Sequence, residues 1–166
     1  MEDSILQDAT ADELLKIYAS TLTELRRRGL IRSTNNPVAD YTEYLVAAAL
    51  NLTLATKSTT GYDATDSEGS KYQIKGRRLT KANRSRQLSF ICGLDLNHFG
   101  YLAAVLFNED FSILRACVIP ATSVEKIAKY VPHVNGWRLV LRDHVWGFAE
   151  ASDITREVSA VAADSS

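Results

Sequence analysis

Four residues near the middle of the chain carry groups that suit metal-ion chemistry. Asp63 is followed, after nine intervening residues, by Gln73, Ile74 and Lys75. A hard divalent cation such as Mg²⁺ prefers oxygen ligands and usually keeps several waters and substrate phosphate oxygens. The Asp63 carboxylate and the Gln73 amide oxygen can supply two ligands, and the Ile74 carbonyl a third. Lys75 beside the metal could orient or deprotonate an attacking water, or stabilise negative charge on a phosphate.

Residues 61–78 are predicted to bring these groups together as a β-hairpin. Residues 67–70 are Ser-Glu-Gly-Ser, a cluster that favours chain reversal between two short strands. Successive side chains of a strand point to opposite faces, so Gln73 and Lys75 share a face. The hairpin would return Asp63 toward both of them, at the edge of a sheet. The alternative is a surface hairpin with an unrelated Asp and Lys.

Asp63 with the Gln-Ile-Lys sequence resembles the PD-(D/E)xK signature of restriction-endonuclease-like nucleases. Tyr62 stands where that family usually has a proline, and Gln73 stands where it usually has an acid, although some branches carry a Gln-x-Lys form. The resemblance covers roughly residues 37–120. It implies a Mg²⁺-dependent phosphodiester hydrolase acting on DNA, in which Mn²⁺ can substitute. It also implies that Asp63 and Gln73 hold the metal and that Lys75 serves the nucleophilic water.

Glu43 is a further candidate ligand on the helix that precedes the hairpin. Asn36 and Pro37 favour a helix start, and the helix is expected to end near Leu50. The positions that share a face with Glu43 are apolar, and burying an ionised carboxylate is costly unless it is paired or holds a metal. The resemblance implies the metal, because these nucleases commonly place an acid on this helix. The alternatives are an internal ion pair, for instance with Lys75, and an exposed helix edge.

A basic segment follows the hairpin directly. Residues 75–86 contain six cations and no acid, whereas the whole chain has a net charge of -1. Phosphate backbones attract such segments, and guanidinium groups can bind phosphate oxygens in pairs. A solvated loop is the alternative interpretation. Because the segment adjoins the candidate metal site, five of its side chains are predicted to bind DNA: Arg77, Arg78, Lys81, Arg84 and Arg86.

The composition is that of one soluble domain. The chain has 166 residues, of which 46% are hydrophobic and 23% charged. No apolar run approaches the roughly 20 residues that span a bilayer, and the acidic start of residues 1–4 is unlike a secretory signal. Cys92 and Cys117 are expected to be buried free thiols in a reducing compartment. We therefore expect a cytoplasmic protein with DNA as its partner and no membrane association, and a homodimer stays open. The three histidines lack ligand or triad spacing and are expected at turns or on the surface.

The remaining elements surround this centre. A capping box at residues 10–13 begins an amphipathic helix that ends in three arginines, which suit its dipole or, alternatively, face DNA. Residues 88–96 alternate like a strand, whereas the resemblance would place a crossover helix nearby. Later patterns predict strands at 101–107, 111–119 and 137–142, a helix from a capping box at 122–125 to about 130, and a frayed helix from 155.

Together these patterns predict a single α/β domain with a mixed central sheet flanked by helices and a restriction-endonuclease-like core. The core would span about 37–120, preceded by an N-terminal helix at about 11–28 and followed by a strand and helix extension at about 121–160. Two other functions stay open. One is a DNA-binding module that kept the fold and lost the chemistry, and the other is a plain protein-interaction domain.

Overall fold

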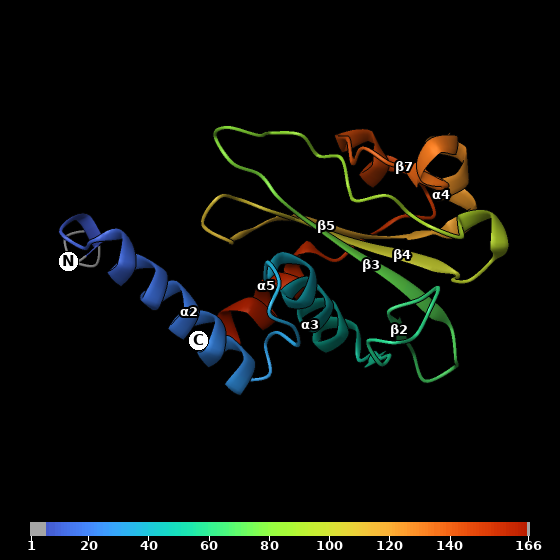
Figure 1. Cartoon of the computed structure of the whole chain (residues 1–166). Coiled ribbons are helices and arrows are strands. Elements are labelled where there is room, and N and C mark those ends of the chain that lie inside the picture. Colours follow the sequence, from blue (N-terminus) through green and yellow to red (C-terminus); the bar gives the residue numbers. More distant parts are fainter. Residues whose placement is uncertain (1–5, 166) are drawn as a thin grey trace.

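Strands β3 (Lys71–Arg78) and β4 (Tyr101–Phe107) are the two central strands of a six-stranded mixed sheet in the computed structural model, which describes residues 6–165. They are parallel, and all other neighbouring pairs are antiparallel. The strand order is β1-β2-β3-β4-β5-β8, where the outer strands are β1 (Thr53–Leu54), β2 (Ala64–Thr65), β5 (Ile113–Pro120) and β8 (Ser152–Asp153). The predicted α/β class and the mixed sheet with helices against it are confirmed (Figure 1).

Two helices cover one face of this sheet. Helix α3 (Val38–Leu50) and the C-terminal helix α5 (Thr155–Asp164) pack there with Ile74 and the buried residues of β4 that share its face. The helix begins at Val38 with Pro37 as its N-cap, so the prediction of Asn36 at the N-cap and Pro37 as first helical residue is wrong by one position. Asn36, one residue before the cap, accepts a hydrogen bond from the Val38 N–H at 3.1 Å. The predicted frayed helix from residue 155 is instead docked on α3 and forms part of the core.

Helix α3 approaches β3 most closely at Gly76. A Cβ atom at Gly76 would lie 2.0 Å from the Thr42 hydroxyl oxygen, which is itself fixed by donating to the Val38 carbonyl at 2.6 Å. Thr42 is fully buried. The glycine is therefore required by helix-sheet packing, because any side chain at this position would push the helix off the strand.

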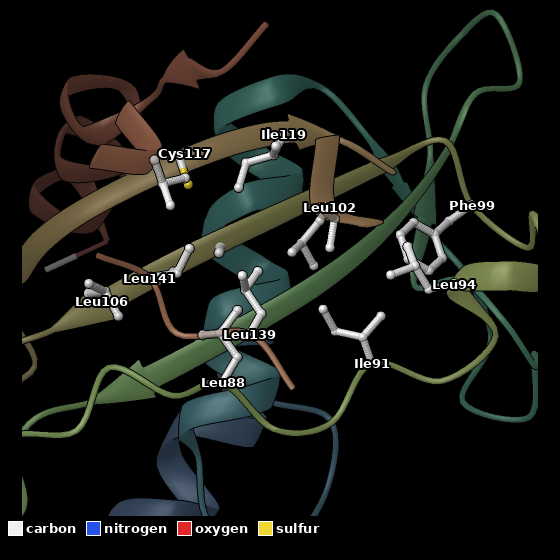
Figure 2. Close-up of a cluster of buried hydrophobic side chains, with 13 residues drawn as sticks. Leu88, Ile91, Leu94, Phe99, Leu102, Leu106, Cys117, Ile119, Leu139 and Leu141 are labelled. Carbon is white, nitrogen blue, oxygen red and sulfur yellow. The ribbon is translucent and has the colours of Figure 1, made fainter. Parts of the chain in front are cut away.

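A second apolar cluster fills the opposite face of the sheet (Figure 2). It combines β4 and β5 side chains such as Leu102 and Ile119 with Leu139 and Leu141 from the second half of the chain. Helix α4 (Ala121–Ile127) and the two-stranded sheet of β6 (Lys129–Val131) and β7 (Gly136–Arg138) lie on this side (Figure 1). The segment beyond residue 120 thus completes both apolar clusters.

The connection between the parallel strands β3 and β4 differs from both expectations. It contains neither the strand predicted at 88–96 nor a crossover helix, but an extended segment with a short 3₁₀ turn, η1 (Leu94–Leu96). In the stretch predicted as a strand, the buried residues are Leu88, Ile91 and Leu94, which are spaced by three. Backbone bonds from Ile91 to Trp137 hold the segment over the sheet. The alternation in the sequence was therefore incidental, because burial follows this spacing of three.

Two other local predictions need correction. The capping box at residues 122–125 does not form, since α4 already begins at Ala121, directly after the last residue of β5, and has no side-chain cap. The strand predicted at 137–142 is shorter and shifted, because β7 covers Gly136–Arg138. The left-handed conformation of Asn135 (φ 47°) makes the predicted turn before it.

Helix α2 (Ala11–Arg27) confirms the first capping box. The Thr10 hydroxyl accepts from the Glu13 N–H at 3.3 Å, and the Glu13 carboxylate accepts from the Thr10 N–H at 2.7 Å. At the other end, Arg27 and Arg28 pair with Glu24. The acidic residues 1–4 lie outside the described part of the chain. Within residues 6–165, no helix combines the length and apolarity needed to cross a bilayer.

Candidate active site

The Asp63 side chain hydrogen-bonds to the edge of β3 just beyond the end of its pairing with β2. Its backbone N–H donates to the Tyr72 carbonyl at 2.8 Å, and strand β2 starts at the next residue. One carboxylate oxygen, Oδ2, accepts from the Ile74 N–H and from the Gln73 Nε2, both at 2.7 Å. The predicted hairpin and the convergence of Asp63 with Gln73 are confirmed. The pairing of the two strands thus places the Asp63 carboxylate beside Gln73 and Ile74, as predicted.

Three oxygens at this edge remain available to a cation. Asp63 Oδ1 and Gln73 Oε1 accept no hydrogen bond from any described residue. The Ile74 N–H points at Asp63, and the N–H and C=O of one strand residue face the same side, so the Ile74 carbonyl points to the same edge. These are the three oxygen donors that the sequence predicted, and their chemistry suits Mg²⁺.

Lys75 lies on the same face of β3 as Gln73. The register places Gln73 opposite Leu102 and Lys75 opposite Ala104, and both partners belong to the apolar cluster on the face opposite α3. Within residues 6–165, the Lys75 ammonium has no ion-pair or hydrogen-bond partner. The predicted alternative pairing of Lys75 with Glu43 is therefore not formed. A half-buried ammonium without an internal partner is available to an anionic ligand.

A cleft of about 780 Å³ opens beside these residues. One wall carries Asp63, Gln73 and Lys75, and the other comes from the crossover segment and from the loop before β7. Polar groups also line this second wall: Cys92, Asp95, His98 and Asn135. Both walls thus carry polar groups, beside the apolar side chains of Phe90, Leu96 and Val134.

His98 is a cleft residue that sequence reasoning missed. It was expected at a turn or on the surface because no spacing related it to Asp63. In the structure a Cβ at Gly61 would lie 2.9 Å from the ring, and one at Gly93 would lie 2.7 Å from its Nδ1. Both glycines have positive φ. Two glycines that leave room for one histidine are visible only once the two segments are folded together.

The two cysteines have different environments. Cys117 is buried in the sheet as predicted, and burial raises the pKa of its thiol to about 12. Cys92 is exposed and lines the cleft, which corrects the prediction that both are buried. The predicted strand would have placed Cys92 on its buried face. In the extended crossover segment Ile91 is the buried residue instead, and Cys92 is exposed. Cys92 therefore places a free thiol that reagents can reach inside the cleft.

Glu43 belongs to a separate ion-pair cluster behind the sheet. It pairs with Arg32 and lies 3.4 Å from Lys57, and it does not line the cleft. Helix α3 packs on the face of β3 opposite the Gln73 and Lys75 side chains, which directs Glu43 away from them. The contacts favour the internal ion pair over the metal ligand, with Arg32 and Lys57 in place of the expected Lys75.

Asp40 is the most buried acid of this cluster, with 4% of its surface exposed. It pairs with Lys57 and accepts from the backbone N–H groups of Arg32 at 2.9 Å and Ser33 at 2.6 Å. Burial by itself raises the pKa of Asp40, but the hydrogen bonds from Lys57, Ser33 and Arg32 outweigh it and lower the pKa to about 2. A carboxylate held this firmly is structural.

The predicted DNA-binding cations of the basic segment fall into two groups, those with an internal hydrogen-bond or ion-pair partner and those without one among the described residues. Arg77 donates to the Ser85 carbonyl at 3.0 Å, and Arg78 donates to the Glu109 carbonyl at 2.7 Å and stacks on the Phe111 ring. Arg86 pairs with Asp143 at 2.6 Å. These three of the five predicted DNA contacts already have internal partners.

Lys81 and Arg84 are the exposed cations of this segment, and neither has a partner within the described residues. They line a second polar cleft of about 440 Å³ with Arg86 and Asn108. Its nearest lining residue along the chain, Leu79, follows Lys75 of the first cleft by four residues, so roughly 13 Å separates the two clefts at about 3.3 Å per strand residue. Of the five side chains predicted to bind DNA phosphates, Lys81 and Arg84 are thus the two that have no partner within the described residues.

The site contains few acids for a metal centre. Among residues 6–165, no group of three or more His, Cys, Asp or Glu side chains is arranged to hold a metal ion. A cation at Asp63 would depend on amide, carbonyl, water and phosphate oxygens for the rest of its shell. A scan against protein-family models finds no match to this chain, and a search of curated proteins finds no match either.

Proposed function

We propose that this protein is a Mg²⁺-dependent nuclease of DNA on a restriction-endonuclease-like core. The observation that carries the proposal is that Gln73 and Lys75, on one face of β3, and Asp63, at the edge of that strand, line one cleft of about 780 Å³. An acid, an amide and an unpaired ammonium at one strand edge are the groups that phosphodiester hydrolysis uses.

The donor set fits Mg²⁺, since it consists of oxygens alone. Asp63 Oδ1, Gln73 Oε1 and the Ile74 carbonyl would hold the ion, with Mn²⁺ as a substitute. When bound, the metal supplies polarisation of a phosphate oxygen and neutralises charge that develops in the transition state. With a single carboxylate, the site depends on a DNA phosphate for further negative charge, so metal and DNA should bind cooperatively.

The protein's own residues would supply the remaining chemistry. Lys75 donates hydrogen bonds to a phosphate oxygen or orients the attacking water, because its ammonium has no competing partner among residues 6–165. Lys81 and Arg84 bind the phosphate backbone in the second cleft, beyond the end of β3, which aligns the DNA strand relative to the first cleft. Asp95 and His98 on the far wall restrict how DNA enters the cleft.

A catalytically inactive DNA-binding module is the second candidate. Two contacts favour it: the Gln73 amide donates to the same carboxylate that would hold the metal, and Glu43 is paired with Arg32. Both contacts satisfy groups that an active centre would leave for the ion. This candidate predicts salt-dependent DNA binding that does not change with Mg²⁺ and no strand cleavage.

Strand cleavage separates the two candidates. Supercoiled plasmid, linear duplex and single-stranded DNA should be incubated with the full chain and millimolar Mg²⁺ or Mn²⁺. We expect cleavage of at least one substrate, abolished by chelation and by Asp63→Asn but not by Asp12→Asn on the exposed face of α2. Binding of DNA without cleavage under any of these conditions would establish the inactive module instead.

Metal calorimetry with a Gln73→Glu variant tests the ligand assignment directly. The substitution keeps side-chain length and adds the charge that the commoner motif carries. Cation affinity rises with ligand charge, so we expect Mg²⁺ to bind about tenfold more tightly without DNA. Mn²⁺, which lies higher in the affinity order for a given ligand set, should bind wild type more tightly than Mg²⁺ does. Equal affinity for wild type and Gln73→Glu would remove Gln73 from the coordination shell.

A further inference from the structure

The second wall of the cleft of about 780 Å³ carries apolar side chains that the proposed chemistry does not use. Leu96 is 62% exposed and Val134 is 38% exposed, and both line this cleft together with the half-buried ring of Phe90. Phe90 and Leu96 belong to the crossover segment between β3 and β4, and Val134 ends the 3₁₀ turn η2 (Pro132–Val134) before β7. Single exposed apolar residues are ordinary, but three that line one cleft from two segments are typical of a surface that contacts a ligand.

Phe90 is fixed in place by close packing on Gly136. A Cβ atom at Gly136 would lie 3.2 Å from the Phe90 Cβ and 3.7 Å from its Cγ. Beside this contact, the backbones of Ile91 and Trp137 exchange two hydrogen bonds, at 2.9 Å and 2.8 Å, which join the crossover segment to β7. A side chain that is ordered before binding loses less conformational entropy when a ligand packs against it. Phe90 therefore offers a preformed aromatic surface to the cleft.

The charged groups of the cleft give a bound molecule one orientation. On the first wall, the Lys75 ammonium has no partner within residues 6–165 and attracts an anionic group. On the second wall, the exposed carboxylate of Asp95 repels an anionic group. Asn135 Oδ1 accepts a hydrogen bond from the Tyr130 hydroxyl at 2.8 Å, which leaves the Asn135 amide N–H groups to donate to a ligand. The cleft thus suits a molecule with a negative charge at one end and a flat apolar ring with polar edges at the other, as in a nucleotide.

We infer that the second wall binds an unpaired base of single-stranded DNA, while the phosphate of the same nucleotide lies at Lys75. The phosphate site rests on the proposed function, and the base site names the form of DNA that the protein acts on. In a duplex the base faces are stacked on one another, so Phe90 could reach one only if a nucleotide were extruded, whereas the bases of a single strand can stack on aromatic side chains. A cleft of about 780 Å³ also has the size of a small-molecule site, usually about 300–1,000 Å³, and suits a short piece of one strand more than a duplex.

Fluorescence anisotropy with end-labelled DNA tests the base site. The full chain should be titrated into three DNA molecules of equal length: a single strand, the same sequence as a duplex, and an abasic strand that keeps the phosphates and lacks the bases. EDTA in every sample removes the metal on which the proposed cleavage depends, so binding is measured independently of cleavage. Stacking on an aromatic side chain contributes a factor of roughly 5 to 150 in affinity per base, so we expect the single strand to bind at least about fivefold more tightly than the other two at the same salt.

Substitutions on the second wall locate the contact. Phe90→Ala should weaken binding of the single strand roughly 5- to 150-fold and leave binding of the abasic strand unchanged, whereas Phe90→Tyr keeps the ring and should retain the affinity. Because Phe90 packs on Gly136, Leu96→Ser supplies a second variant at an exposed position, where we expect a smaller loss of affinity with the fold intact. Leu15→Ser, at a 67% exposed leucine of α2 outside the cleft, is the matched control and should bind like wild type. The melting temperature of each variant establishes that it folds.

Equal or tighter binding of the abasic strand or of the duplex overturns the base site, as does wild-type affinity for the single strand in both Phe90→Ala and Leu96→Ser. Failure of this site and failure of the proposed function give different results. Cleavage of DNA with Mg²⁺ by a chain that binds the abasic strand as tightly as the single strand would support the nuclease and refute the base site. Selective binding of the single strand through Phe90, without cleavage of any DNA, would support the base site and refute the nuclease.

Discussion

The two faces of strand β3 carry polar clusters of opposite character. Behind the sheet, Asp40 and Glu43 share two cations, Arg32 and Lys57, and each carboxylate is paired. On the cleft side, Asp63 has no cationic partner within 4.0 Å among the described residues, although Lys75 lines the same cleft. The first cluster balances its charges internally, and the second leaves one acid and one cation available to a ligand.

This difference indicates that the Asp40–Glu43 cluster stabilises the fold, whereas the groups in the cleft are available for chemistry. A buried ion pair with its lone pairs satisfied holds segments together, since removing one partner leaves an uncompensated charge. Arg32 also donates to the Ala55 carbonyl at 2.8 Å, and the Ala55 N–H bonds the Asp63 carbonyl at 2.8 Å. The structural cluster therefore supports the backbone that positions the chemical one, and substitutions in the two should have separable effects.

The largest expected effect is on the cleft side. Lys75→Ala should lower the rate of DNA cleavage by roughly 100- to 1000-fold, which is typical for the loss of one transition-state stabiliser. Its melting temperature should stay within a degree or so of wild type, because the Lys75 ammonium has no partner in the part of the chain that the structure describes. Lys126→Ala, an exposed lysine on α4, is the matched control and should retain full activity. Full activity in Lys75→Ala would remove this residue from the mechanism.

Gly76→Ala should break the packing between the two clusters. The added methyl group meets the Thr42 hydroxyl at 2.0 Å, so we expect a loss of about 1–3 kcal/mol in the free energy of unfolding. Thr42→Ala in the same chain should recover part of it. Gly147→Ala, where a Cβ meets no atom within 4 Å, should change stability little. Urea unfolding of wild type, Gly76→Ala, Thr42→Ala and the double variant measures the coupling, and its absence would show that α3 tolerates displacement.

Asp40 should make stability depend on pH in acid. Its pKa is about 2 in the folded chain against an ordinary 3.8, which corresponds to about 2 kcal/mol. A lowered carboxyl pKa stabilises the fold above pH 4, and that contribution is lost as the pH falls from about 4 to 2. Asp40→Asn should therefore lower stability by about 1–2 kcal/mol at pH 7 and far less at pH 2.5, without reducing cleavage. An equal difference at both pH values would contradict this.

The smallest effect is expected in the basic segment. Replacing Lys81 and Arg84 together by Ala should reduce the log-log salt dependence of DNA binding by about 1.8, since two contacts each contribute about 0.9. Lys126 and Lys129, both exposed and outside the two clefts, make a matched double control. A slope unchanged by the first pair would show that these cations are merely solvated.

The sequence determined the hairpin and its contents. A Ser-Glu-Gly-Ser turn and the alternation of a strand were sufficient to place Asp63 beside Gln73, because both are local features set by backbone geometry. The first capping box and the apolar run of β4 were equally predictable, since each depends on residues close in sequence. The three available oxygens at the strand edge follow from the same local rules.

The second wall of the cleft and the partners of Glu43 were decided only by the tertiary structure. His98 meets Gly61 and Gly93 because an extended crossover folds back over the sheet, and no periodicity encodes that path. Glu43 pairs with Arg32 and Lys57 because the close approach at Gly76 fixes α3 on the far face of β3. Contacts between segments far apart in sequence depend on how elements pack, and a single sequence records composition and period but not packing.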